Sequence, residues 1–373
     1  MTALNDPSLF LTGIRNPQAE TMLREALRHL AAQLHDHAPH GLRAVYLGGG
    51  YGRGEGGVRT RPDASVTLYN DLDCFVIASD GLRRADRDAL VPHLAELAHP
   101  LERRLGIDID FSPPKRASQL RRVAPTLMFQ EFRRGYVTLF GDDALPRTAI
   151  PELPAHDLPL SEALRLLLNR GMGLLLAGEA LAGRGDNPNH HDFILRNLNK
   201  AILGCGDALL IARNAYDWSL HARLERLQND IPDAPHSLAQ RYRQAIDFKF
   251  SPHDALPPNP RQTWHDLRRL WRDTLAAIAE LDDTHSDPMT PADVRNALHR
   301  LCRRQPGARS LRHALRWLVR TRSPQPVALL GDDPIALVLA QLAEALLVPS
   351  VSPDSGDFPD IPETLRQHWR HFN

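Results

Sequence analysis

Residues Ala44–Val76, AVYLGGGYGRGEGGVRTRPDASVTLYNDLDCFV, contain seven glycines between two apolar runs, and two aspartates follow one residue apart. Glycine lets backbone N–H groups approach a phosphate closely. Paired carboxylates suit Mg²⁺, which takes one or two carboxylate ligands and completes its shell with substrate phosphates. A glycine loop followed by a carboxylate strand therefore predicts chemistry on a nucleoside triphosphate.

The residues around this stretch predict short strands mixed with helices. We expect helices over 17–35 and 86–104, and strands over 44–47, 65–69, 72–77, 106–111 and 138–141. On a strand, Asp71 and Asp73 point to one face because Leu72 stands between them, and Asp108 and Asp110 share a face in the same way. If the two strands are neighbours, three or four carboxylates converge beside the glycines, as two-metal phosphoryl or nucleotidyl transfer requires.

The second half of the chain has helical periodicity almost throughout. Prolines at 146, 151, 154 and 159 predict a linker, and loops are expected at 251–260 and 350–362. The predicted helices cover 160–182, 191–213, 262–282, 291–304, 308–320 and 334–347. The fold class is therefore α+β: a small domain with a mixed sheet over 1–150, followed by an all-helical domain over 158–373.

Composition limits the function classes. Basic and acidic residues number 45 each, so no net field recruits nucleic acid, which is an unlikely partner. The three cysteines, Cys74, Cys205 and Cys302, are far apart and odd in number, so neither a disulfide framework nor a zinc ribbon is supported. MTALNDPSLF lacks the layout of a signal peptide, and no apolar run is long enough for a membrane helix. We expect a soluble cytoplasmic protein without a membrane partner.

The segments LGGGYGRGE and NDLDCFV resemble the signature of the nucleotidyltransferase superfamily, the group that includes polymerase β. That signature is a Gly-[Gly/Ser] pair after a strand and an acid–apolar–acid triplet on the next strand. The sequence GGYGRGE at 49–55 is similar to the glycine motif of the uridylyltransferases that modify nitrogen-signalling proteins. The resemblance covers roughly residues 40–145. It implies a polymerase β-like catalytic domain, with the helical domain binding the acceptor.

The resemblance also implies roles for the acidic residues. Asp71 and Asp73 would bind two Mg²⁺ ions, and the third acid would come from Asp110, with Asp108 as its competitor. The metals would activate an acceptor hydroxyl, steady the α-phosphate and neutralise the departing pyrophosphate. The implied reaction is transfer of a nucleoside monophosphate from a nucleoside triphosphate (NTP) to a hydroxyl.

Further residues would hold the triphosphate. Gly49 and Gly50 would bind it through backbone N–H groups, and Arg53 would steady its phosphates. Lys200 is a candidate phosphate contact because helical domains of related transferases supply basic groups; a solvated or salt-bridged lysine is the alternative. The acceptor stays open between a protein side chain and a small molecule, with an RNA 3′ end least favoured.

The sequence departs from the family pattern in one respect. Twenty residues separate Gly50 from Asp71, more than the family usually has. This insert either forms an extended hairpin or displaces the phosphate site. The alternative function is a catalytically silent nucleotidyltransferase-like binding or regulatory module, such as one component of a toxin–antitoxin pair. The presence of all the expected acids argues against that alternative.

Two other motifs lack the sequence context that their functions require. Gly52, Gly54 and Gly57 satisfy G-x-G-x-x-G, but no helix is expected after them, as a dinucleotide site requires. The run His190–Asn197 fits the H-x-D-x-x-x-x-N of kinase catalytic loops. The residues that follow continue as a helix, for which Asp192 is expected to be the N-cap.

Overall fold

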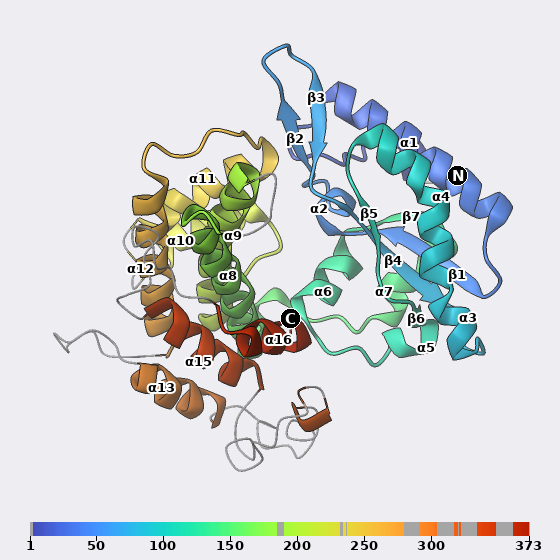
Figure 1. Ribbon diagram of the computed structural model, residues 1–373. Coiled ribbons are helices and arrows are strands. Elements are labelled where there is room, and N and C mark those ends of the chain that lie inside the picture. The colour runs from blue at the N-terminus through green and yellow to red at the C-terminus, as the bar shows by residue number, and fades with distance from the viewer. Residues whose placement is uncertain are drawn as a thin grey trace. The chain divides into compact units, whose positions relative to one another are not determined.

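The computed structural model describes residues 3–184, 190–231, 234–235, 237–279, 291–303, 317–319, 321, 334–347 and 361–372 (Figure 1). The chain divides into two compact units. The first consists of Met1–Pro154 with Asp247–His253, and the second of Ala155–Ile246 with Asp254–Asn373. The first unit thus includes a short segment from far along the chain, which the sequence did not indicate. The division into a catalytic domain over 1–150 and an acceptor-binding domain over 158–373 stays a prediction.

The first unit contains a mixed sheet, as predicted. Its strand order is β5-β4-β1-β7, with β6 also beside β4. β1 is antiparallel to β4 and β7, whereas β4 is parallel to β5 and β6. The strands are β1 (Leu42–Leu47), β4 (Leu72–Ala78), β5 (Ile109–Phe111), β6 (Lys115–Arg116) and β7 (Val137–Phe140). β5 is shorter than expected because Gly106, with a φ of 70°, caps the preceding helix.

The long insert between the glycines and the aspartates forms a hairpin. β2 (Gly57–Thr60) pairs antiparallel with β3 (Val66–Tyr69) in a separate two-stranded sheet. At its tip, Asp63 accepts hydrogen bonds from the Ser65 N–H and hydroxyl at 3.0 and 2.6 Å. The expectation of an extended hairpin is confirmed.

Helices cover both faces of the main sheet. They are α1 (Pro17–His37), α2 (Gly49–Gly52), α3 (Arg84–Asp88), α4 (Leu90–Leu105), α5 (Ala117–Leu120), α6 (Leu127–Arg134) and α7 (Leu145–Ala149), after a 3-10 turn, η1 (Ala3–Asn5). Leucines of α1 and α4 pack on one face with Val45 and Leu47 of β1. Tyr46 points to the other face and packs with Phe132 of α6. This alternation along β1 is the period-two pattern of a strand buried on both faces.

The described part of the second unit contains helices and no strand. After η2 (Ala155–Asp157), they are α8 (Leu160–Leu181), α9 (His190–Ala212), α10 (Leu220–Asn229), α11 (Leu238–Phe250), α12 (Pro260–Ala279), α13 (Pro291–Arg303), α15 (Pro334–Leu347) and α16 (Glu363–Phe372). The last turn of α11 is counted in the first unit. Periodicity located α8, α9, α12, α13 and α15 closely but missed α10, α11 and α16. Most of the predicted helix over 308–320 and of the loop over 350–362 lies outside the described residues.

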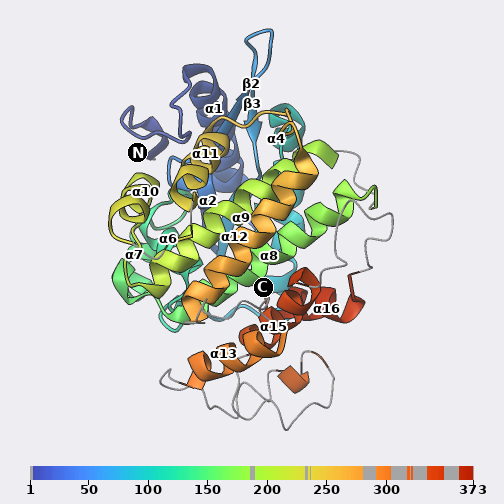
Figure 2. The ribbon, with the colours of Figure 1, turned by 90° about the vertical axis from the view of Figure 1, so that its left-hand side faces the viewer.

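Three long helices, α8, α9 and α12, lie side by side in the second unit (Figure 2). The indole N–H groups of Trp264 and Trp271 donate to the carbonyls of Leu174 and Leu167, at 2.7 and 3.0 Å. Both rings are buried, so these bonds satisfy polar groups that would otherwise lie in an apolar core. Among the helices that the structure describes, none has the length and apolar character that a bilayer crossing requires.

Candidate functional site

Two of the predicted carboxylates are neighbours on adjacent strands. Asp73 of β4 is paired in register with Asp110 of β5, and the two strands run parallel. Both side chains are exposed, whereas Leu72, Cys74 and Ile109 are buried on the opposite side of the strands. The two acidic strands are therefore neighbours, which was the condition for their carboxylates to converge, and the pairing register brings Asp73 and Asp110 to one face.

The other two aspartates flank this pair. Asp71 directly precedes β4, and the Asp108 carbonyl accepts the N–H of Leu72 at 2.9 Å, just before β5 begins. Burial and the negative charges of Asp71, Asp108 and Glu102 raise the pKa of the Asp110 carboxyl. These carboxylates therefore repel one another at the positions they occupy, and a cation among them would relieve the repulsion.

Glu102 is a site residue that sequence reasoning missed. It lies on α4, and its carboxylate accepts the N–H of Ile109 at 3.0 Å, one residue before Asp110. This bond ties the start of β5 to the helix and so sets the position of Asp110. A glutamate on the polar face of an amphipathic helix carries no local sign of such a role, because the bond depends on where β5 packs.

The sequence predicts that carboxylates of this site bind magnesium. The described residues include no cluster of three or more His, Cys, Asp and Glu side chains arranged to hold a metal ion. Mg²⁺ needs only one or two protein carboxylates, because waters and substrate phosphates complete its shell. Carboxylate oxygens are the ligands it prefers. The exposed register pair Asp73–Asp110 meets that number. The metal-ligand roles of Asp71, Asp73, Asp108 and Asp110 stay predictions.

The glycine turn lies directly against Asp73. Because β1 and β4 are antiparallel, the end of β1 meets the start of β4, and the Gly48 N–H donates to the Asp73 carbonyl at 2.8 Å. Gly49 has a φ of 59°, and a Cβ there would lie 2.0 Å from Asp73 Oδ2. Both observations require glycine at position 49. They also show how closely the turn and the carboxylates approach each other.

Gly50 differs from Gly49 in having room for a side chain. A Cβ at Gly50 would meet its nearest atom, the carbonyl oxygen of Glu55, at 3.5 Å, which is ordinary van der Waals contact. Its φ is not among the positive ones. Nothing in the packing of the described chain therefore requires glycine at position 50.

Other glycines of the stretch serve packing. A Cβ at Gly54 would lie 2.8 Å from the Phe10 carbonyl oxygen, and a Cβ at Gly57 would lie 2.8 Å from the Lys249 carbonyl oxygen. These glycines allow two remote segments of backbone to approach the turn. The glycine content that suggested a phosphate loop is thus partly explained by close packing within the unit.

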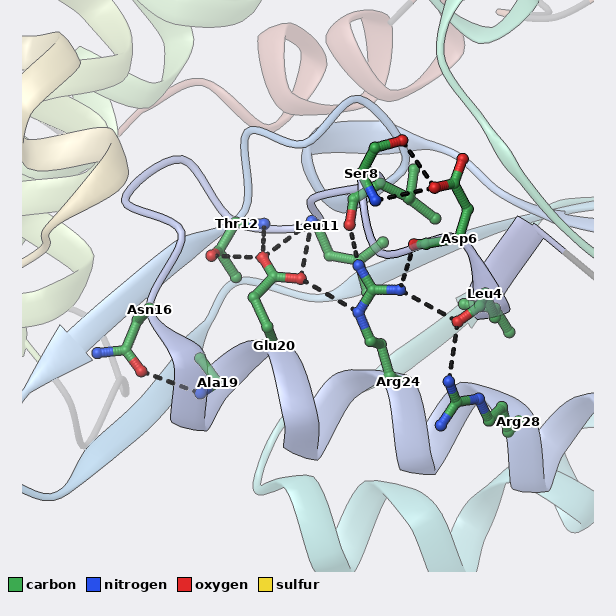
Figure 3. A network of polar contacts seen from close by, with 11 residues as sticks. Leu4, Asp6, Ser8, Leu11, Thr12, Asn16, Ala19, Glu20, Arg24 and Arg28 are labelled. Atoms are coloured by element: carbon green, nitrogen blue, oxygen red, sulfur yellow. Dashed lines mark hydrogen bonds and ion pairs between the residues drawn. The ribbon is translucent and has the colours of Figure 1, made fainter.

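One of those remote segments is the N-terminal stretch before α1 (Figure 3). Glu20 of α1 is 7% exposed and accepts hydrogen bonds from the N–H groups of Leu11 and Thr12, at 2.9 and 2.8 Å. The Thr12 hydroxyl donates to the same oxygen at 2.8 Å. The Leu11 carbonyl in turn accepts the N–H of Gly56 at 3.1 Å. A buried carboxylate on α1 therefore supports the far end of the glycine stretch.

The two predicted cationic phosphate contacts are placed differently. Arg53 forms ion pairs with Glu55 and Glu131, both at 3.1 Å, so contact with a phosphate would require it to change partners. Lys200 lies on α9 in the second unit with an exposed side chain. The phosphate roles of both residues stay predictions.

The structure corrects the expected helix start near the kinase-like motif. α9 begins at His190, so Asp192 lies inside its first turn and pairs with Arg196 at 3.2 Å instead of acting as the N-cap. The Asn197 side chain donates to the Phe193 carbonyl of the same helix at 2.9 Å. These residues form a helix and not a catalytic loop. Gly57, the last glycine of the G-x-G-x-x-G match, begins strand β2, so the helix of a dinucleotide site does not follow it.

Comparison with known proteins does not show which family the chain belongs to. No family model matches the chain, and no curated protein matches it. Among solved structures, the chain is similar to the spectinomycin adenyltransferase AAD(9) from Enterococcus faecialis, crystallised with ATP and spectinomycin. The identity is 14%, the TM-score is 0.37, and the alignment covers 66% of this chain and 98% of that chain. A TM-score below 0.5 does not establish a shared fold, so the chemistry of the site has to be derived from its own residues.

Proposed function

We propose that this protein is a Mg²⁺-dependent nucleotidyltransferase that moves a nucleoside monophosphate from an NTP to a hydroxyl, releasing pyrophosphate. The acceptor hydroxyl belongs to a small molecule or a protein. The observation that carries the proposal is the register pair Asp73–Asp110 beside the turn at Gly49 and Gly50. Carboxylates that repel one another next to an open backbone are suited to a cation and a phosphate.

Asp71, Asp73 and Asp110 are the residues that would hold Mg²⁺. When bound, the ion supplies charge that stabilises the phosphoryl group and lowers the pKa of the attacking hydroxyl. Gly49 keeps its Cα against the Asp73 carboxylate, so the turn and the acid stay in register. Gly50 is partly exposed and has no side chain, so its backbone N–H is the group that we assign to a phosphate. The protein thus contributes position and electrostatics, which dominate catalysis of phosphoryl transfer.

The first experiment is isothermal titration of ATP, CTP, GTP and UTP, each with Mg²⁺, into the wild type and an Asp73→Asn/Asp110→Asn double variant. Asp86→Asn, an exposed change on α3, is the control. We expect one triphosphate to bind with a metal requirement, and the double variant to lose at least about 100-fold in affinity. Equal binding by the double variant and the control would refute the assignment of the carboxylates.

Binding is then followed by label transfer. NTP labelled at the α-phosphate should leave its label on a hydroxyl acceptor, whereas a γ-label should be recovered in pyrophosphate. Triphosphate binding without transfer to any protein or small-molecule acceptor would support the silent regulatory module instead. If no triphosphate binds the wild type, the proposal is wrong.

A further inference from the structure

Three consecutive residues of the segment Asp247–His253 pack on the glycine stretch and on the N-terminal stretch beside it, although the segment is remote in sequence. The Phe248 ring packs edge-on against Tyr69, with centroids 6.0 Å apart. The Phe250 ring occupies the space where a Cβ of Gly13 would stand, 2.2 Å from it. Between them, the carbonyl of Lys249 approaches Gly57. The close fit at each of the three residues indicates an integral part of the first unit.

The side chain of Lys249 reaches a charge network on the turn. Its Nζ lies 2.6 Å from Glu55 Oε2, and the two side chains are 22% and 15% exposed. The same oxygen lies 3.1 Å from a guanidinium nitrogen of Arg53, and another nitrogen of that group contacts Glu131 at 3.1 Å. Ion pairs that are mostly removed from water are less screened than surface pairs, so this network can restrain backbone.

The network acts on Gly50 through backbone hydrogen bonds. The Gly50 carbonyl accepts the N–H of Glu55 at 2.8 Å and that of Arg53 at 3.2 Å. Arg53 and Glu55, whose side chains belong to the network, therefore also close the turn, because their backbone N–H groups donate to the Gly50 carbonyl. A cation that immobilises the Glu55 side chain also restrains the Glu55 N–H.

We propose that Lys249 is a positioning residue that fixes the turn Gly49–Glu55 by holding Glu55. Any consequence for nucleotide binding rests on the proposed function, whereas the restraint on the turn does not. Only three of the 45 basic residues of the chain are lysines. A compact ammonium suits a carboxylate oxygen that already accepts from an arginine, because a second planar guanidinium would need more room.

The test is native-state amide hydrogen exchange of the full chain without nucleotide, comparing wild type with Lys249→Met. Exchange at the Arg53 and Glu55 amides should rise about tenfold, which corresponds to a local loss of about 1.4 kcal/mol. The amides of Val45 and Tyr46 in β1 should be unchanged. Lys249→Arg keeps the charge but has less room beside Arg53, so it should restore only part of the protection.

Two further variants make the result specific. Lys115→Met is the matched control: it removes a lysine of the same unit that lies 5.6 Å from the Phe129 ring, away from the turn. It should not alter exchange at the turn. Glu55→Gln retains the backbone N–H but removes the charge, and it tests the same link if Lys249→Met folds poorly. Unchanged exchange at the turn, or an equal rise throughout β1 and β4, would overturn the proposal.

A parallel titration with ATP and Mg²⁺ separates positioning from direct contact. If Lys249 positions the turn, Lys249→Met should speed exchange in the free protein and weaken triphosphate binding about tenfold together. Weaker binding with unchanged exchange would mean that Lys249 contacts the phosphates itself, and the positioning role would be wrong. If wild type binds no triphosphate, the exchange result still decides the proposal.

Discussion

Gly50→Ala separates the structural from the functional use of glycine in the turn. A methyl group at position 50 meets its nearest neighbour at 3.5 Å, and residue 50 lies in α2 with no positive φ. Replacing a glycine at such a position stabilises a protein by about 0.4–1 kcal/mol, chiefly by reducing the entropy of the unfolded chain. We expect Gly50→Ala to stabilise the first unit while reducing triphosphate affinity at least about tenfold, because the methyl adds bulk to the backbone that the proposed function assigns to phosphate binding.

Gly49→Ala is the matched variant, and we expect it to destabilise the first unit. Its methyl would stand 2.0 Å from Asp73 Oδ2, and its φ of 59° is unfavourable for alanine. The backbone conformation alone costs about 1–2 kcal/mol. The gain from the unfolded chain is common to both changes, so the two adjacent Gly→Ala variants should differ by at least about 1–2 kcal/mol in stability.

The assay has to report on the correct unit. All five tryptophans belong to the second unit, so their fluorescence does not follow the first. Amide exchange of β1 and β4 measures the stability of the first unit, and isothermal titration measures triphosphate binding. Wild-type affinity in Gly50→Ala would refute the role of this backbone in holding phosphate. A loss of stability in Gly50→Ala would refute the packing argument.

Three further changes test the electrostatics of the chain. Asp110→Asn should raise the free energy of unfolding of the first unit by about 0.2–1 kcal/mol, since it removes a like-charge cross-strand neighbour. Because the folded-state pKa of Asp110 is raised, wild-type stability should fall as pH rises through the range just above the usual carboxyl value of 3.8. Amide exchange should show no such pH dependence in the variant. Glu20→Gln should cost about 1–3 kcal/mol, because it removes the charge and replaces Oε2, which accepts the Leu11 N–H at 3.2 Å and lies 3.8 Å from Arg24, with an NH₂ donor while keeping Oε1 as an acceptor. The loss should appear as faster amide exchange at the end of the glycine stretch, whereas Glu25→Gln, 53% exposed on the same helix, should have no effect. Asp207→Ala should destabilise the second unit by about 3–5 kcal/mol, since it leaves Arg223 buried without the carboxylate that it contacts at 2.8 Å. Urea unfolding followed by tryptophan fluorescence measures this loss of stability. A loss below about 1 kcal/mol would contradict the role of the buried ion pair.

Local features of the sequence were sufficient to predict many of the strands in the first unit. The apolar run before Gly48 and the acid–apolar–acid alternation around Leu72 predicted β1 and β4, since strand periodicity is a property of neighbouring residues. The insert between them was expected to form a hairpin, and it forms β2 and β3. Alternation also indicated which face of each acidic strand carries its carboxylates. The helix α6 was missed because a pattern of eight residues is difficult to distinguish from a turn, whereas α11 is as long as α13 and no apolar stripe was recognised in it.

A glycine turn followed by a strand with paired carboxylates could be predicted from the sequence, because both features depend on neighbouring residues. The positions of Asp110 beside Asp73, of Glu102 at the start of β5, and of Lys249 against Glu55, 194 residues away in the chain, depend on the folded unit. Strand neighbours and remote ion pairs are chosen by burial of apolar surface summed over the whole unit, which no single segment encodes. For the same reason Gly50 can be distinguished from Gly49 only once the atoms around each are in place.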